Sequence, residues 1–166
     1  YNTDGLGYIE GLKQKLNFNP YKSTILILGA GGSAKAIVYN LLRENVSRIY
    51  IVNRTKSKAI NLAKSFKTES CNMIGLRLED LSGIDLHNID LVINTTTVGL
   101  KKDDIPLINL DFFSKDVIIS DIIMRPLYTK LIKEAIRLNK SYYTGDNMLI
   151  YQINYMNEIW GFECLP

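Results

Sequence analysis

The feature that most restricts what this chain can fold into is an apolar run that stops at a glycine-rich turn. Residues 25–28 are branched and apolar, residues 29–34 read Gly-Ala-Gly-Gly-Ser-Ala, and a helical pattern follows directly. A buried parallel strand that enters such a turn and continues as a helix is typical of nucleotide-binding βα units. The alternative is a glycine-rich turn that only joins a strand to a helix.

Each small residue of the turn has a role in the nucleotide-binding interpretation. Gly29 permits the tight turn, Gly31 lets the backbone approach a pyrophosphate, and Ala34 allows the helix and the strand to pack closely. The free N–H groups at the start of the following helix then face the anion. The turn therefore predicts a bound dinucleotide that contacts residues 29–34.

The composition is that of one soluble globular domain. The chain has 166 residues, of which 46% are hydrophobic and 22% are charged, and its net charge is +3. Because the basic residues are spread along the chain, nucleic-acid binding has little support. Cys71 and Cys164 lack metal-ligand or redox spacing, which indicates a reducing cytoplasm. No apolar run is long enough to span a membrane and no signal peptide is recognisable, so no membrane association is expected.

The spacing of apolar residues predicts strands that alternate with helices along the whole chain. We expect a single doubly wound α/β domain of the Rossmann type over residues 1–166, with a mostly parallel sheet and helices on both faces. The predicted strands cover residues 25–28, 48–52, 72–75, 89–93, 117–120 and, at an edge of the sheet, 142–143. The predicted helices cover residues 4–16, 34–45, 59–66, 127–138 and 147–160.

The residues after the second predicted strand distinguish between the two nicotinamide dinucleotides. An enzyme that prefers NAD usually has Asp or Glu there to bind the ribose 2′-hydroxyl. Residues 53–58 instead read Asn-Arg-Thr-Lys-Ser-Lys, with three cations and no carboxylate. Arg54 can grip a 2′-phosphate and Lys58 can add a point charge, while Asn53 and Thr55 can donate hydrogen bonds. This chemistry favours NADP.

A simpler interpretation is that the lysines at 56 and 58 only form the solvated first turn of a helix. Cations near a helix N-terminus are mildly unfavourable unless an anion compensates them. A bound phosphate would be such an anion.

Six motifs in series resemble the signatures of shikimate dehydrogenases. Residues 2–7 resemble N-T-D-G-x-G, residues 29–36 resemble the glycine-rich turn of that family, and residues 53–58 resemble N-R-T-x-x-[RK]. The remaining three are residues 94–100 (N-[AT]-T-x-x-G-[ML]), 121–129 (D-x-x-Y-x-P-x-x-T) and 145–152 (G-x-x-M-L-x-x-Q). Any one of these motifs is weak, but six in order cover essentially the whole chain.

The resemblance implies an enzyme that passes a hydride from NADPH to the ketone of 3-dehydroshikimate, which gives shikimate. Members of that family have two domains with the substrate between them, and this chain resembles the NADP-binding one. The abrupt start at Tyr1 suggests a piece of a longer protein. In the family, the catalytic lysine belongs to the other, N-terminal domain. We therefore expect the chain to bind NADPH with little or no turnover of its own.

The resemblance also implies roles for individual residues. Asp4 matches the aspartate that pairs with the catalytic lysine and binds substrate hydroxyls, and Gln152 matches the glutamine that reaches the substrate from the last helix. The expected cofactor contacts are Gly29, Ala30, Gly31, Gly32, Ser33, Ala34, Asn53, Arg54, Thr55, Lys58, Asn94, Thr95, Thr96, Met124, Gly145 and Met148. Met124 stands where the family usually has Tyr, so the apolar bulk remains and a hydrogen bond is lost. No metal site is expected.

Simpler interpretations stay open for several of these residues. Asp4 can be a plain helix cap, Met148 can be ordinary core filling, and residues 95–97 can simply end a strand. Asp121 can only cap a turn, and His87 falls in an outer connection and is given no catalytic role. For the whole chain, the alternatives are a quinate/shikimate dehydrogenase that accepts NAD and a non-catalytic dinucleotide-binding module. The opening and closing helices are also expected to expose Tyr and Leu residues through which the chain self-associates.

Overall fold

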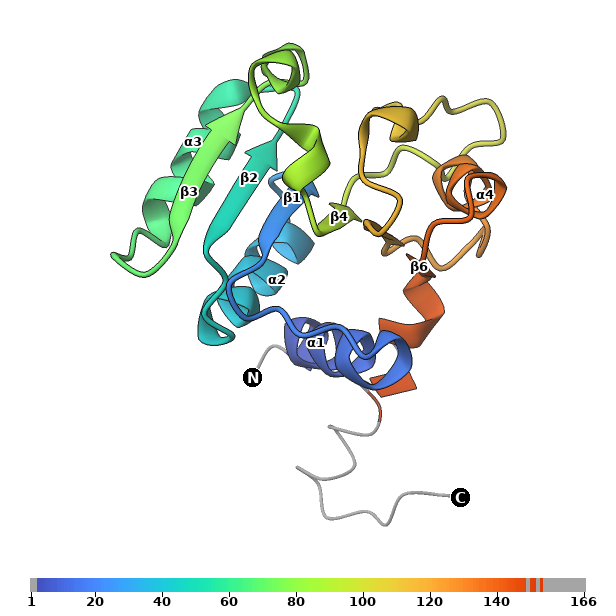
Figure 1. Cartoon of the computed structure of the whole chain (residues 1–166), viewed down its shortest axis with the longest axis horizontal. Coiled ribbons are helices and arrows are strands. Elements are labelled where there is room, and N and C mark those ends of the chain that lie inside the picture. The colour runs from blue at the N-terminus through green and yellow to red at the C-terminus, as the bar shows by residue number, and fades with distance from the viewer. Residues whose placement is uncertain (1–2, 149, 152, 154–166) are drawn as a thin grey trace.

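Six parallel strands form the centre of the molecule (Figure 1). The computed structural model describes residues 3–148, 150, 151 and 153, apart from the side chains of residues 3 and 4. The strand order is β3-β2-β1-β4-β5-β6, and every neighbouring pair is parallel. Because the order reverses between β1 and β4, the predicted doubly wound sheet is confirmed.

The strands lie close to their predicted positions. They are β1 (Thr24–Leu28), β2 (Arg48–Val52), β3 (Asn72–Leu76), β4 (Leu91–Asn94), β5 (Ile118–Asp121) and β6 (Tyr142–Tyr143). The helices are α1 (Thr3–Leu16), α2 (Gly32–Arg43), α3 (Lys56–Ser65) and α4 (Lys130–Arg137), with short 3-10 turns η1 (Glu79–Gly83), η2 (Leu86–Asn88) and η3 (Leu110–Phe112). β6 is an edge strand, as predicted.

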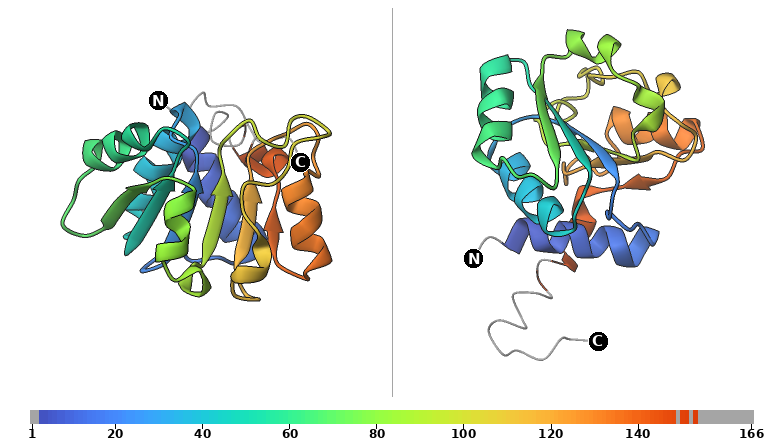
Figure 2. Two further views of the ribbon diagram at one scale, coloured as in Figure 1. Left: turned by 90° about the horizontal axis from the view of Figure 1, so that it is seen from above. Right: turned by 60° about the vertical axis from the view of Figure 1, so that its left-hand side comes forward.

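Alternating side chains along the strands fill two cores, one on each face of the sheet. Ile25 and Ile27 of β1 pack with the buried faces of α1, α2 and α3. Leu26 and Leu28 point to the opposite face, where α4 and the 3-10 turns cover the sheet. The right-hand view of Figure 2 shows the two layers with the sheet between them. The prediction of helices on both faces is therefore confirmed.

The opening helix α1 is more buried than expected. Ile9 and Leu12 lie in the first core, as their helical spacing predicts, and Tyr8 is buried beside them. Tyr8 packs edge-on against Tyr143 of β6, with ring centroids 5.6 Å apart. Tyr8 is therefore not one of the exposed tyrosines expected on this helix, because its side chain faces the sheet.

Several predicted helix boundaries shift by two or three residues, among them the start of α3, which is predicted at residue 59 and lies at Lys56. The helix predicted from residue 127 begins at Lys130, since the Thr129 hydroxyl caps it by accepting the Ile132 N–H at 3.3 Å. Tyr128 consequently precedes the helix, and its ring lies near that of Tyr142. The last helix begins at Gly145 rather than at residue 147, and residues 154–160 of its predicted range lie outside the described residues.

Candidate functional site

The glycine-rich turn lies at the carboxyl edge of the sheet, beside the reversal of strand order. Gly29 leaves β1 with a φ of +110°, which L side chains rarely adopt, and its N–H donates to the Val52 carbonyl at 2.7 Å. A Cβ atom here would also lie 2.5 Å from Thr95 Oγ1. The fold itself therefore requires Gly29, as predicted for a tight turn.

Gly31 and Gly32 have no such structural requirement. A Cβ atom at either position would meet nothing within 4 Å, and both residues are exposed. Gly31 is the N-cap of α2 with φ −92° and has no side chain that could cap the helix, and the first turn of α2 contains no acidic residue. Exposed glycines in front of uncapped N–H groups fit the close approach of an anionic phosphate. Ala34, one turn further on, is fully buried, as close packing of helix and strand requires.

The residues after β2 present cations at the same edge of the sheet. Arg54, Thr55 and Lys58 are exposed, and Asn53 Nδ2 donates to the Thr55 carbonyl at 3.0 Å. Thr55 is the N-cap of α3, yet its hydroxyl makes no capping hydrogen bond. The first turn of α3 contains no acidic residue. These side chains could therefore bind a phosphate group.

Lys56 forms an ion pair with a carboxylate from a different connection of the chain. Its Nζ lies 2.8 Å from Asp80 Oδ2 in η1, and the Arg77 N–H donates to the same oxygen at 2.8 Å. The Lys56 ammonium and then the Arg77 N–H hold the pKa of Asp80 below its ordinary value. The anion that compensates Lys56 is thus supplied by the chain, and Lys56 by itself gives no support to a bound phosphate.

The segment after β4 chiefly forms its own turn. Thr95 Oγ1 donates to the Leu28 carbonyl at 2.8 Å, which holds the segment next to the glycine-rich turn. The Asn94 side chain is buried and donates to the Val98 carbonyl at 3.0 Å. It also accepts hydrogen bonds from the Thr96 N–H and hydroxyl at 3.1 and 2.7 Å. These bonds agree with the simpler interpretation of a strand end, and cofactor contact by these residues stays a prediction.

Asp121 at the end of β5 fixes the loop that carries Met124. Its buried carboxylate accepts the Ile123 N–H at 3.0 Å and the Thr129 hydroxyl at 2.8 Å. Burial raises the pKa of Asp121 above its ordinary value, against the lowering effect of these hydrogen bonds. Asp121 therefore does more than cap a turn, because it joins β5 to the start of α4. Met124, within this loop, is 51% exposed.

Gly145 and Met148 lie at the start of the last helix. A Cβ atom on Gly145 would lie 2.4 Å from the Ile122 carbonyl oxygen, so only glycine fits where this helix meets the loop after β5. Met148 is half-buried and packs against the core beneath α1, α2 and α3. Both positions thus have a packing explanation, and their place beside a nicotinamide stays a prediction.

The structure does not describe the side chains of the two residues that are predicted to bind the substrate. Asp4 lies in α1, but its side chain is outside the described residues, and Gln152 is outside them altogether.

His87 is exposed in η2, on an outer connection as predicted. Among the described residues, no cluster of His, Cys, Asp or Glu could hold a metal ion. Within the same part of the chain, no helix is long and apolar enough to cross a membrane.

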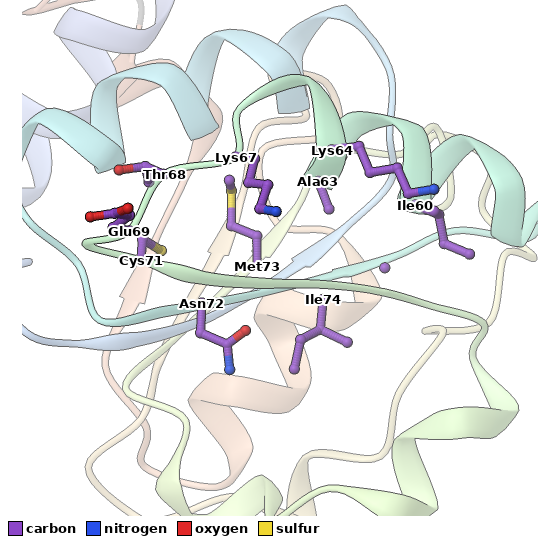
Figure 3. A pocket seen from close by; sticks show the side chains of 11 residues that line it. Ile60, Ala63, Lys64, Lys67, Thr68, Glu69, Cys71, Asn72, Met73 and Ile74 are labelled. Carbon is purple, nitrogen blue, oxygen red and sulfur yellow. The ribbon is translucent and has the colours of Figure 1, made fainter.

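A separate hollow of about 540 Å³ lies along the outer edge of the sheet, between α3 and β3. Figure 3 shows Lys64 and Lys67 on its helix side and Cys71 and Met73 on its strand side. None of the residues predicted to contact a cofactor or a substrate lines it. The hollow is therefore distinct from the glycine-rich turn and the neighbouring cations.

The strand order, its reversal beside β1 and the glycine-rich entry to α2 define a Rossmann-type α/β domain. The family model described as shikimate / quinate 5-dehydrogenase matches residues 11–102, which is more than half of the chain. The chain therefore belongs to the shikimate/quinate 5-dehydrogenase family.

Individual relatives match over nearly the whole chain. A shikimate dehydrogenase (NADP(+)) from Aquifex aeolicus is 37% identical over 97% of this chain and 55% of its own length. Its counterpart from Methanopyrus kandleri is 33% identical over 100% of this chain and 59% of its own length. The crystal structure of shikimate 5-dehydrogenase from Listeria monocytogenes, in complex with shikimate and NAD, gives a TM-score of 0.87 at 28% identity, covering 99% and 59% of the two chains. The chain thus spans somewhat more than half the length of these relatives.

Proposed function

We propose that this chain is the NADP-binding domain of a shikimate dehydrogenase, which reduces 3-dehydroshikimate to shikimate in aromatic amino acid biosynthesis. Residues 1–166 are taken as one domain. Membership of the family supports the reaction, and the groups at the carboxyl edge of the sheet support the cofactor.

The observation that carries the proposal is the pair of exposed glycines at the N-terminus of α2. Gly31 and Gly32 have no contact that excludes a side chain, and Gly31 adopts a φ of −92° that any residue tolerates. Their lack of a Cβ atom is explained by a ligand that lies against the backbone. A pyrophosphate fits, since it would accept hydrogen bonds from the uncapped N–H groups of the helix.

The choice of NADP rests on the residues that follow β2. Arg54 and Lys58 supply positive charge for a 2′-phosphate, and the hydroxyl of Thr55, which does not cap α3, supplies a hydrogen bond. The two relatives named as NADP(+) enzymes agree with this choice. The Listeria monocytogenes structure contains NAD, so cofactor preference has to be measured directly.

When bound, NADPH supplies the hydride that reduces the substrate ketone. The residues of this chain bind the cofactor and orient it. The backbone at Gly31 holds the pyrophosphate, and Arg54 holds the 2′-phosphate. Asp121 fixes the loop with Met124, which we place beside the nicotinamide. Asp4 and Gln152 are proposed to bind substrate hydroxyls from the two ends of the chain.

The substrate and the partner domain also belong to the proposal. In the family, the catalytic lysine lies in a substrate domain whose motifs have no match in these 166 residues, so the chain alone should hold the cofactor without efficient turnover.

Ile150 and Ile153 are 53% and 47% exposed, which supports self-association through the closing helix. Sedimentation of the chain tests this, and a monomer at every concentration contradicts it.

The experiment that tests the function is a fluorescence titration of the 166-residue chain with NADPH, followed by addition of 3-dehydroshikimate. We expect saturable binding and almost no oxidation of NADPH. Absence of binding contradicts the proposed cofactor. Turnover within the ordinary enzyme range of about 1–1000 per second contradicts the need for a separate substrate domain.

A further inference from the structure

Lys56 and Asp80 form an ion pair at the edge of the proposed 2′-phosphate site. Lys56 is the first residue of α3, directly after residues 53–55, and Asp80 belongs to η1, which follows β3. The charged atoms are 2.8 Å apart, and the two side chains are 41% and 34% exposed. The pair is thus accessible to solvent and lies beside the residues that we propose to bind the phosphate.

The register of the sheet brings these two side chains together. β2 and β3 are parallel with Val52 opposite Leu76, and the Asn53 N–H donates to the Leu76 carbonyl at 3.1 Å. The connection after β3 therefore runs alongside the residues after β2. The Arg77 N–H donates to Asp80 Oδ2 at 2.8 Å, which fixes the carboxylate in this connection.

Of the three cations after β2, Lys56 is paired with Asp80, whereas the other two are not in an ion pair among the described residues. Arg54 and Lys58 are exposed and make no ion pair within the part of the chain that the structure describes. Lys56 is neutralised by Asp80. Because the pKa of Asp80 is lowered, the carboxylate is ionised at neutral pH and also repels a phosphate dianion.

We propose that Asp80 is a specificity-determining residue that limits the preference for NADP over NAD by keeping Lys56 away from the 2′-phosphate. This inference rests on the proposed function, since it requires a 2′-phosphate beside Arg54 and Lys58. Once released, the flexible stem of Lys56 would let its ammonium group turn towards the phosphate. NAD has a hydroxyl in place of the phosphate and would gain almost nothing from the released charge.

The test is a double-variant cycle with Asp80→Asn and Lys56→Met, read by fluorescence titration with NADPH and NADH at low salt. Asparagine keeps an oxygen that can accept the Arg77 N–H and removes only the charge. We expect Asp80→Asn to tighten NADPH binding about threefold to tenfold and to change NADH binding by less than about twofold.

The second variant shows whether the gain comes through Lys56. Lys56→Met alone should weaken NADPH binding by up to about tenfold, because it leaves the negative charge of Asp80 uncompensated near the phosphate. Added to Asp80→Asn, it should remove most of the gain, whereas simple loss of repulsion by Asp80 would leave the gain in place. Circular dichroism and thermal midpoints near those of the wild type establish that the variants are folded.

The possible failures are distinguishable. NADPH affinity that is unchanged or weaker in Asp80→Asn, or a gain that the double variant keeps in full, overturns the inference about Asp80 and leaves the proposed cofactor intact. A wild-type chain that does not prefer NADPH to NADH overturns both. A preference that survives Arg54→Ala also overturns both, because the phosphate would then bind elsewhere.

Discussion

The Asp121 carboxylate accepts a hydrogen bond from the Thr129 hydroxyl at 2.8 Å, and this contact ties the end of β5 to the start of α4. Both side chains are 1% exposed. The residues between them, 122–128, include Met124, so the loop that we place beside the nicotinamide is held at both ends. A loop that is ordered in advance costs less conformational entropy when a ligand binds.

Thr129→Val measures how much this contact stabilises the fold. Valine keeps the branched shape but loses the donor to Asp121 and the acceptor for the Ile132 N–H. The free energy of unfolding should fall by about 2–4 kcal/mol, and urea denaturation measures it. The matched control is Thr97→Val at an exposed threonine, which should stay within about 0.5 kcal/mol of the wild type. Equal stability of the two variants would contradict a structural role for the contact.

The raised pKa of Asp121 should be visible in the pH dependence of stability. Between the ordinary value of 3.8 and the raised value, the folded chain binds more protons than the unfolded chain. Stability therefore falls as the pH rises through this window, and Asp121→Asn removes that contribution. In urea denaturation from about pH 3 to about pH 7, the variant should become more stable relative to the wild type as the pH increases. A constant difference across this range would count against the raised pKa.

Gly31→Ala separates ligand binding from folding. The added methyl group meets nothing within 4 Å, so the free energy of unfolding should stay the same or rise by up to about 1 kcal/mol. If a pyrophosphate lies against this backbone, the methyl group takes part of its space, and NADPH binding should weaken at least about tenfold. Thermal unfolding and fluorescence titration measure the two effects.

Gly29→Ala is the matched control for that experiment. Its φ of +110° and the close approach of Thr95 Oγ1 make alanine strained there, so this variant should lose about 1–3 kcal/mol of stability. If Gly31→Ala binds NADPH like the wild type, the proposed position of the pyrophosphate is wrong. If Gly31→Ala loses as much stability as Gly29→Ala, the conclusion that a side chain fits at residue 31 is wrong.

The sheet and the glycine-rich turn could be predicted because their signals are local. β1 and β2 are short apolar runs bounded by turns, and the predicted range of β2 agrees with Arg48–Val52. Helix ends were less predictable, since they depend on single contacts. The Thr129 hydroxyl delays the start of α4, and the close approach of Gly145 to the Ile122 carbonyl accompanies an earlier start of the last helix.

The ion pair and the hydrogen bond that could not be predicted from the sequence join residues that are separated along the chain. Asp80 reaches Lys56 only because β3 pairs with β2 in one register, and no pattern within residues 53–58 indicates this carboxylate. Asp121 and Thr129 both belong to a recognised motif, but only the fold shows that they are bonded to each other. Cofactor contacts by Asn94 and Met148 stay predictions, because the structure gives each of them a packing or hydrogen-bonding role in the chain itself.

The most direct test of the central proposal is the ratio of the dissociation constants for NADH and NADPH, measured for the wild-type chain and for Arg54→Ala. Arg54 is exposed beside the uncapped N-terminus of α3, where we place the 2′-phosphate. We expect the wild type to bind NADPH at least about tenfold more tightly than NADH, and Arg54→Ala to lose most of that difference. Equal affinities in the wild type, or a preference that Arg54→Ala leaves intact, would contradict an NADP site at residues 53–58.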